Sequence, residues 1–275
     1  MNRLFVVNKP TGISSNRFLG KIKRKYGVKK AGFSGTLDPF AKGTLVVAFG
    51  QYTKLFRFLN KNKKSYRATL WLGATSPTLD IEKVEKVVDI MPFADYSLKI
   101  IEDSMKGEIE YLPPKYCAKR VNGRRAYALA RQDKEFELNA IKSSIYDFKI
   151  LHYMHPFLTF EITISEGGYI RSMGQIIANK FGFDGCLSAL ERLSEGSFVY
   201  EDEKPLNPLD FINIQDNEYL GDIEDIELGR KVFVSNFKQQ EAGLYKIVLK
   251  DEFSLVEITK GQERVQYILN KVKLC

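Results

Sequence analysis

The chain has 275 residues, 44% of them hydrophobic and 28% charged, which suits a globular protein with one large domain and a smaller one, or two of modest size. It contains no run of 18 apolar residues, so we expect no membrane-spanning helix, and its three scattered cysteines exclude a disulfide framework or a zinc site. Because the chain opens on a strand-like run without an apolar signal region, we expect a reduced, cytoplasmic setting.

The net charge of +8 is spread unevenly. Residues 1–75 contain 16 Lys and Arg but a single acid, Asp38, and residues 115–131 contain six Lys and Arg and no acid. Residues 201–227 contain ten acids and one lysine. Such asymmetry favours a polyanionic partner such as nucleic acid, because each neutralised phosphate releases counterions. A lysine-rich surface that only keeps the protein soluble explains the same charge, so charge alone leaves both interpretations open.

The N-terminal third alternates strands and helices. Residues 3–10 predict a buried strand that Pro10 ends, and residues 14–27 predict a helix with a serine cap, an apolar side, a cationic side and a final glycine. Three further elements follow from the apolar pattern: a strand buried on both faces at 43–50, a short helix at 52–61 and an alternating strand at 64–73.

The pattern weakens after Gly73. Residues 83–90 are compatible with a strand, 95–105 and 122–132 have helical spacing, and paired prolines make 111–116 a turn or an extended segment. Strand patterns follow at 136–138, 144–154 and 157–165, a helical period at 168–182, a boundary at 204–210, and a small all-β unit with strands at 243–250, 254–260 and 264–269. Because several adjacent strands have no helix between them, we predict an α+β fold with a mixed, largely antiparallel central sheet and flanking helices.

Asp38 has two interpretations. Asp followed by Pro39 is typical of a helix N-cap with proline at the first position, and Gly43 would close a single turn. Alternatively, a basic field keeps this lone carboxylate ionised, and it acts as a nucleophile on an electrophilic carbon. The pattern alone favours the cap, while the composition favours the nucleophile.

Other chemistries lack support in the sequence. There is no phosphate-binding GxxxxGK[ST] and no GxGxxG, and the two histidines, His152 and His155, have the wrong spacing for one shared face, so we predict no metal site. Residues 165–172, "SEGGYIRS", are a glycine-rich turn that caps the following helix, with Arg171 as a surface phosphate contact in the alternative interpretation.

Several motifs occur together in a fixed order: "NKPTGISSN", "AGFSGTLDPFAKGTLVVAFGQYTKL", "KSYRATLWLG", "PPKYCAKRVNGRRAYALAR", "GGYIRS" and "LERLSEGSF", at 8–16, 31–55, 64–73, 113–131, 167–172 and 190–198. This set closely resembles the TruB-type tRNA pseudouridine-55 synthases over roughly residues 4 to 200. The resemblance implies a pseudouridine synthase catalytic domain at 1–212 and a small β-rich, PUA-like C-terminal domain at 213–275.

The resemblance also implies a reaction and its residues. The family cleaves the N-glycosidic bond of one T-loop uridine, turns the base and rejoins it through carbon, without a cofactor or metal. Asp38 matches the catalytic aspartate, Arg171 the arginine that pairs with it, and Tyr66 the active-site tyrosine. A bidentate guanidinium would keep the carboxylate charged and aimed. Positions that line the uridine pocket are matched by Tyr169 and Leu190, and Lys9 would support the loop beneath Asp38.

The implied partner is the T-stem and loop of tRNA, whose target base must be flipped out of its stack. Basic residues would contact the RNA backbone, and the stretch 113–131 resembles the family's RNA-clasping insertion. We assign the backbone contacts to Lys21, Arg24, Lys119 and Arg124. No feature indicates an obligate dimer, so we expect a monomer.

Two departures from the family pattern bear on the site. Phe33 stands where the family usually has histidine, and a phenyl ring stacks on a base but donates no hydrogen bond. Residues 73–80, "GATSPTLD", lack the usual T-D-T-x-D pattern, which leaves open how this loop meets RNA. A non-catalytic RNA-binding or tRNA-folding protein with the same basic surface is the alternative function, in which Asp38 only caps a turn.

Overall fold

A computed structural model describes residues 1–274. Within them, nine strands form the large sheet, in the order β1-β3-β12-β4-β11-β10-β7, with β2 paired to β3 and β13 paired to β12. These strands are β1 (Arg3–Lys9), β2 (Ala31–Ser34), β3 (Lys42–Phe49), β4 (Lys64–Leu72), β7 (Gly107–Tyr111), β10 (Ile141–Met154), β11 (Phe157–Ile164), β12 (Gly185–Glu195) and β13 (Phe198–Val199). Within residues 1–274, the strand pairs of this sheet are antiparallel except β12 with β3. The predicted mixed, largely antiparallel sheet is therefore confirmed.

Local sequence explains the best-predicted elements. In β3 every residue after Lys42 is buried, as its continuous apolar run requires, and β4 alternates between buried and more exposed residues. The helix α1 (Ser15–Lys25) begins at Ser14, whose hydroxyl accepts the Arg17 N–H at 3.3 Å, and a left-handed Gly27 follows it. Residues 50–57 form a 3₁₀ helix, η1 (Gly50–Arg57), where a short helix was predicted.

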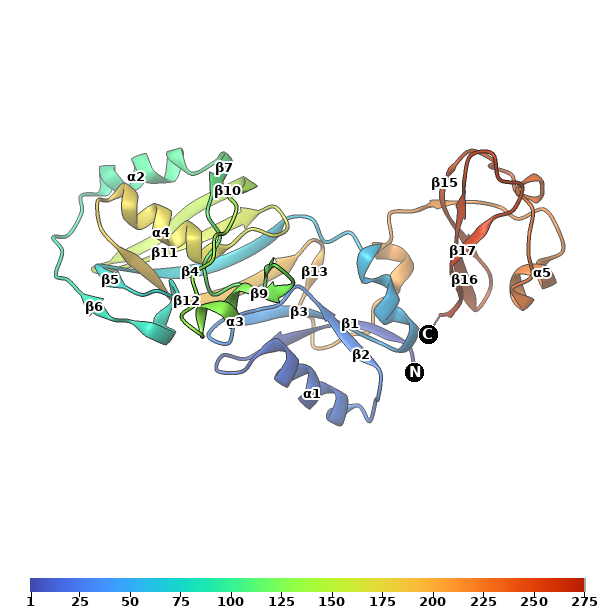
Figure 1. The fold of residues 1–275 in the computed structure, drawn as a ribbon, viewed down its shortest axis with the longest axis horizontal. Helices are drawn as coiled ribbons and strands as arrows, with labels where there is room; N and C mark the ends of the chain where they lie inside the picture. The colour runs from blue at the N-terminus through green and yellow to red at the C-terminus, as the bar shows by residue number, and fades with distance from the viewer. Residues whose placement is uncertain (275) are drawn as a thin grey trace.

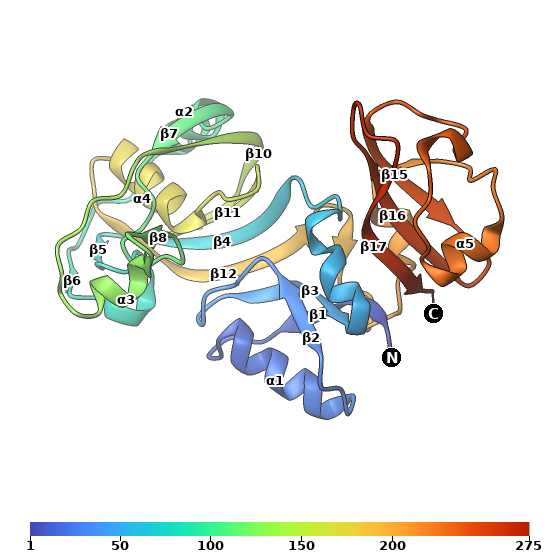
Figure 2. The ribbon, with the colours of Figure 1, turned by 45° about the vertical axis from the view of Figure 1, so that its right-hand side comes forward.

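Helices cover the two ends of the large sheet separately (Figures 1 and 2). The helix α1 packs on β1, β2 and β3 through a small apolar core. At the other end, α2 (Asp95–Ser104) and α4 (Ile170–Lys180) pack on β4, β10, β11 and β12 through a larger one. The strand β12 joins the two ends because it pairs with both β3 and β4. A cavity between the two ends therefore has walls from distant parts of the chain.

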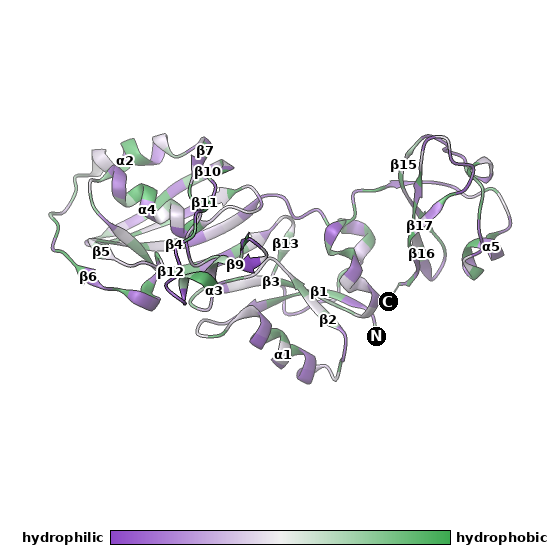
Figure 3. Ribbon diagram, in the orientation of Figure 1, coloured by the Kyte–Doolittle hydropathy of each residue, from purple (hydrophilic) through white to green (hydrophobic). Residues whose placement is uncertain are grey.

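Shorter elements lie outside the large sheet. The strand β5 (Ala74–Thr75) pairs with β6 (Lys86–Val87), and the 3₁₀ turn η2 (Ile81–Lys83) lies between them. The basic stretch 113–131 contains the hairpin β8 (Arg120–Val121) and β9 (Arg124–Arg125), followed by the five-residue helix α3 (Ala126–Ala130). Figure 3 shows hydrophilic residues on this hairpin and on α1.

The C-terminal residues form a second sheet in the order β14-β15-β16-β17. Its elements are β14 (Gln215–Asp216), α5 (Ile223–Leu228), β15 (Gly243–Val248), β16 (Glu252–Ile258) and β17 (Gln266–Lys273), with the turns η3 (Pro208–Phe211) and η4 (Val234–Asn236). This arrangement confirms a small β-rich unit of the PUA-like kind. It contacts the first part of the chain: the Gln51 amide donates to the Lys271 carbonyl at 2.9 Å, and Phe253 and Leu255 share a core with Leu4 and Val46.

Some sequence predictions were wrong. Residues 136–138 form no strand, and residues 83–90 contain only the two-residue strand β6. By contrast, the short helix predicted at 122–132 is present as α3, over residues 126–130. The strands β2, β7 and β12 and the helix α5 were not predicted. None of the helices in residues 1–274 is both long and apolar enough to cross a membrane.

Candidate active site

A cavity of about 300 Å³ opens between the two ends of the sheet. Five segments supply its walls: the loop 35–38, the start of β4, residues 117–118, the turn 166–171 and the end of β12. Of the residues predicted from sequence, five line it, namely Asp38, Tyr66, Tyr169, Arg171 and Leu190. The fold thus brings together side chains that are up to 152 positions apart in the sequence (38 to 190).

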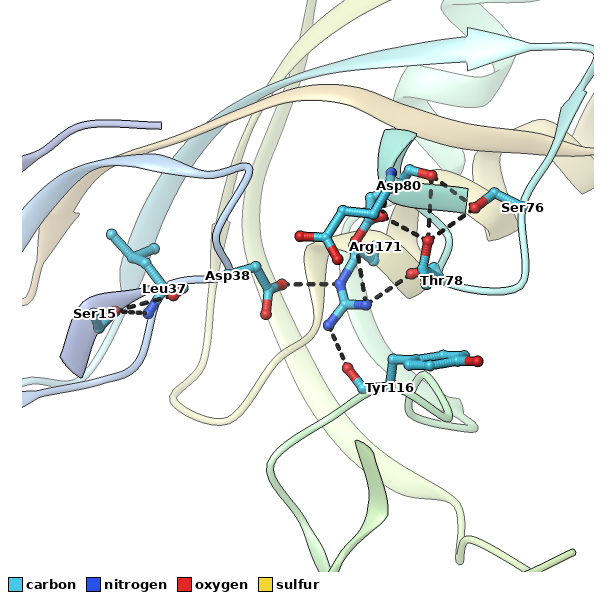
Figure 4. Close-up of polar contacts among 9 residues, drawn as sticks. Ser15, Leu37, Asp38, Ser76, Thr78, Asp80, Tyr116 and Arg171 are labelled. Atoms are coloured by element: carbon cyan, nitrogen blue, oxygen red, sulfur yellow. Dashed lines mark hydrogen bonds and ion pairs between the residues drawn. The ribbon is translucent and has the colours of Figure 1, made fainter. Parts of the chain in front are cut away.

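Asp38 lies in a turn, not at a helix start. The chain from 35 to 41 has no helix, and the Ala41 N–H donates to the Asp38 carbonyl at 3.1 Å across Pro39. The helix-cap interpretation is therefore wrong. The preceding residue is clamped by Ser15, whose hydroxyl donates to the Leu37 carbonyl at 3.0 Å and accepts its N–H at 2.9 Å (Figure 4). This clamp fixes the backbone from which the Asp38 side chain reaches the cavity.

The Asp38 carboxylate contacts Arg171. The Nε atom of Arg171 lies 2.9 Å from Asp38 Oδ2, and the two side chains are 5% and 36% exposed respectively. Arg171 is thus buried, which excludes its interpretation as a surface phosphate contact. The pair is also not bidentate, because Nη1 donates to the Thr78 carbonyl at 2.7 Å and Nη2 to the Tyr116 carbonyl at 2.9 Å (Figure 4). Arg171 therefore ties three separate loops to one point.

A second carboxylate, missed in the sequence, lies behind Arg171. Asp80 is buried, its Oδ2 is 3.5 Å from Arg171 Nη1, and its Oδ1 accepts the Thr78 hydroxyl at 2.6 Å and the Glu82 N–H at 2.9 Å. It belongs to the loop 73–80 that departs from the family pattern. This loop thus meets Arg171 directly.

Burial and charge act in opposite directions on Asp38. Burial raises the pKa of the Asp38 carboxyl above its ordinary value, Asp80 adds to this rise, and Arg171 and Lys9 oppose it. The basic field inferred from sequence is therefore only part of the electrostatics. The ionised form of Asp38 depends on the Arg171 guanidinium.

Lys9 lies beneath the Asp38 turn. Its side chain is fully buried, and its Nζ donates to the carbonyls of Ala41 at 2.7 Å, Pro10 at 2.9 Å and Pro39 at 3.5 Å. Burial lowers the pKa of Lys9 to about 8, although Asp38 opposes this shift.

This pKa predicts a pH dependence of stability. Between pH 8 and 10.5 the native state releases the Lys9 proton while the unfolded state keeps it, so the free energy of unfolding rises with pH. Lys9→Met has no such proton to release. We therefore expect the free energy of unfolding of the wild type, relative to that of Lys9→Met, to rise by about 2–3 kcal/mol over this range. Urea denaturation at several pH values measures it. Parallel pH profiles of the two proteins would contradict the assignment.

Among the remaining predicted residues, Tyr66, Tyr169 and Leu190 line the cavity, whereas Phe33 and the basic residues do not. Phe33, in β2, packs toward α1 and does not line the cavity, and its contact with the base stays a prediction. Lys21 and Arg24 are exposed on α1, and Arg124 is exposed on β9 with Lys119 partly exposed before β8. Tyr169 is held at the cavity by its N–H, which donates to the Tyr111 hydroxyl at 3.0 Å, and burial raises the pKa of its phenol.

Solved structures share this fold. A structure of an H/ACA RNP bound to a substrate RNA containing 2′-deoxyuridine matches 99% of this chain and 85% of its own chain, with a TM-score of 0.64 and 17% identity. A Cbf5-Nop10-Gar1 complex matches 99% of this chain and 84% of its own, with a TM-score of 0.64 and 18% identity. At these identities the likeness shows the pseudouridine synthase fold alone.

Comparison of the sequence with known proteins shows which family of pseudouridine synthases the chain resembles. Residues 23–170 match the model of the TruB family pseudouridylate synthase, N-terminal domain. The chain is 52% identical to tRNA pseudouridine synthase B of Campylobacter curvus over 275 residues, the full length of both, and 52% identical to the protein of the same name from Sulfurovum over 272 residues, 99% of this chain and 98% of that one. The chain therefore belongs to the TruB family of pseudouridylate synthases. It is accordingly an enzyme of the isomerase class.

Proposed function

We propose that the chain isomerises the T-loop uridine at position 55 of tRNA to pseudouridine, with Asp38 as the nucleophile. The observation that carries the proposal is the Asp38–Arg171 pair on the wall of a cavity of about 300 Å³, beside Tyr66. Relatives that are 52% identical over essentially the full length are named tRNA pseudouridine synthase B, which supports tRNA as the substrate.

The geometry suits such a reaction. The isomerisation breaks the N1–C1′ bond and forms a C5–C1′ bond, while N1 gains a proton and C5 loses one. Arg171 contacts one oxygen of Asp38, so the other is available to attack the electrophilic carbon, and the carboxylate leaves again when the new bond forms. Tyr66 projects from β4 into the same cavity, where its ring can stack on the uracil and its hydroxyl can carry a proton.

The basic stretch 113–131 extends from the cavity to the surface, and we propose that it clasps the T-stem and loop. Its residues Cys117 and Ala118 line the cavity, and the Tyr116 carbonyl accepts a hydrogen bond from Arg171. Further along the same stretch, Arg124 is exposed. Phosphate contacts of this kind supply affinity and orientation, while the shape of the RNA supplies selectivity. On the exposed face of α1, Lys21 and Arg24 would extend the same backbone contact. We further propose a catalytic domain at 1–212, a C-terminal domain at 213–275, a monomeric state and action in the cytoplasm.

The test is a T-arm transcript that carries tritium at C5 of its uridines. We expect the wild type to release tritium from one site, and mass spectrometry of the digested product to place the pseudouridine at position 55. A transcript with cytidine at this position is the matched control and should release none from the T-loop. Tight binding without tritium release would favour the non-catalytic RNA-binding alternative instead.

A further inference from the structure

A second cluster of charges lies on the cavity wall, apart from the Asp38–Arg171 pair. Its members are Lys64 at the start of β4, Glu166 in the turn before α4, and Arg192 and Glu195 at the end of β12. Lys64, Glu166 and Arg192 line the cavity. The proposed reaction assigns no role to any of them.

Within this cluster, Arg192 and Glu195 are occupied by the protein itself. The Arg192 Nε donates to the Thr44 carbonyl at 2.8 Å and Nη2 to the Gly35 carbonyl at 2.9 Å, while Nη2 lies 3.3 Å from Glu195 Oε2. Glu195 is fully buried and accepts the Ser34 hydroxyl at 2.7 Å. Burial alone would raise the pKa of Glu195, but Arg192, Lys64 and Ser34 hold it below its ordinary value. This pair therefore holds the loop that carries Gly35.

Lys64 is placed differently. Its Nζ lies 3.4 Å from Glu195 but also 3.5 Å from Glu166, and the two carboxylates differ sharply, with Glu195 0% and Glu166 50% exposed. Lys64 thus shares the buried Glu195 with Arg192, and its second partner, Glu166, is half-exposed. An ion pair with one solvated member is weak and easily exchanged. Lys64 is thus a mostly buried cation, 9% exposed, whose anion on the cavity side can be replaced.

The position of Lys64 fits the phosphate of a nucleotide whose base lies at Asp38. A Cβ on Gly35 would be 3.0 Å from Lys64 Nζ, so the ammonium lies against Gly35. Gly35 precedes Asp38 by three residues, which places their Cα atoms no more than about 11 Å apart. One nucleotide, with its base at one end and its phosphate at the other, can bridge that span within a single cavity.

We propose that Lys64 binds a phosphodiester group that flanks the flipped uridine, and that Glu166 occupies this site as a substitute anion in the free enzyme. The inference rests on the proposed function, because it takes the cavity as the site of the target nucleotide. An ammonium on a buried stem is a compact point charge suited to a phosphate oxygen, and Glu166 leaves with its turn as the phosphate enters. Lys64 acts as a positioning residue, since it holds the nucleotide while Asp38 meets the reacting carbon.

The experiment pairs protein variants with chemically modified RNA. T-arm transcripts carry a neutral methylphosphonate either 5′ or 3′ to the target uridine, and Kd, KM and kcat are measured for the wild type, Lys64→Gln, Lys64→Arg and Glu166→Gln. At one of the two positions we expect the methylphosphonate to lower kcat/KM of the wild type and of Lys64→Arg about tenfold. The kcat/KM of Lys64→Gln should be the same with this RNA as with the natural one. The salt dependence of binding should weaken in Lys64→Gln by about one phosphate contact.

Glu166→Gln should act in the opposite direction, because it removes the competing anion. We expect its KM for the natural transcript to fall two- to fivefold, and this gain should vanish with the methylphosphonate RNA and in the Lys64→Gln background. Lys63→Gln is the matched control, since Lys63 is the exposed neighbour of Lys64 with its Nζ over the Tyr146 ring, and its effect should be the same on every RNA.

Two outcomes would overturn the inference while the wild type remains active. The first is additivity: if Lys64→Gln and the methylphosphonate each lower kcat/KM, and their effects multiply at both the 5′ and the 3′ position, then Lys64 does not contact either phosphate. A rise in KM for Glu166→Gln would mean that the ion pair only supports the turn. By contrast, a wild type that forms no pseudouridine on the natural transcript contradicts the proposed function itself, and the Kd measurements then decide the phosphate contact separately.

Discussion

Replacement of Asp38 by Asn should lower the single-turnover rate of pseudouridine formation by more than about 10⁴-fold, with Kd for the T-arm changed less than about threefold. An amide has the shape of the carboxylate and can still accept from Arg171 Nε, but it is not a nucleophile. The fold should tolerate it, because the pKa of Asp38 is raised by burial, which means that the native site disfavours the charge. Asp80 also remains to pair with Arg171.

The measurement uses enzyme in excess over a transcript labelled at C5, so that the chemical step is observed directly. Asp210→Asn, an identical chemical change at an exposed site in η3, serves as the control and should keep the wild-type rate. A residual rate above about one hundredth of the wild type, after contaminating wild-type enzyme is excluded, would show that Asp38 is not the nucleophile.

Elements with a strong local pattern were predictable from sequence. The apolar run of β3, the alternation of β4 and the serine cap of α1 each specify their structure within a few neighbouring residues. The strand β12 gives no such signal, because register irregularities at 187–189 and 192–194 interrupt its alternation and its partners β3 and β4 are distant in sequence. Residues 136–138 are the opposite case. Their composition is typical of a strand, but they have no partner strand and form none.

The site was predictable only where side chains carry the chemistry. Composition singled out Asp38, and the motifs pointed to Tyr66 and Arg171, which do line one cavity. Backbone carbonyls leave no trace in sequence, so the anchoring of Arg171 by Thr78 and Tyr116 could not be inferred. Asp80 was hidden for a related reason, because its loop departs from the family pattern and its burial beside Arg171 follows from the tertiary fold.

From the sequence we expect a bidentate pair between Arg171 and one carboxylate, but in the structure each guanidinium nitrogen contacts a different partner. This difference makes a second prediction. Arg171→Lys keeps the charge, but a single ammonium cannot contact Asp38 and the carbonyls of Thr78 and Tyr116 together, so we expect the rate to fall about 10²- to 10³-fold.

Arg171→Met should be more severe, because it leaves Asp38 and Asp80 beside each other without their cation. Removing one partner of a buried ion pair costs about 3–5 kcal/mol of unfolding free energy, measurable by urea denaturation. The catalytic consequence has a definite sign. Arg171 lowers the pKa of Asp38 and Asp80 raises it, so loss of Arg171 raises it further. Since only the ionised carboxylate attacks, the rising limb of the pH–rate profile must move to higher pH in this variant, and residual activity should recover on the alkaline side. A limb at the wild-type pH would mean that Arg171 holds the loops together without controlling the charge of Asp38.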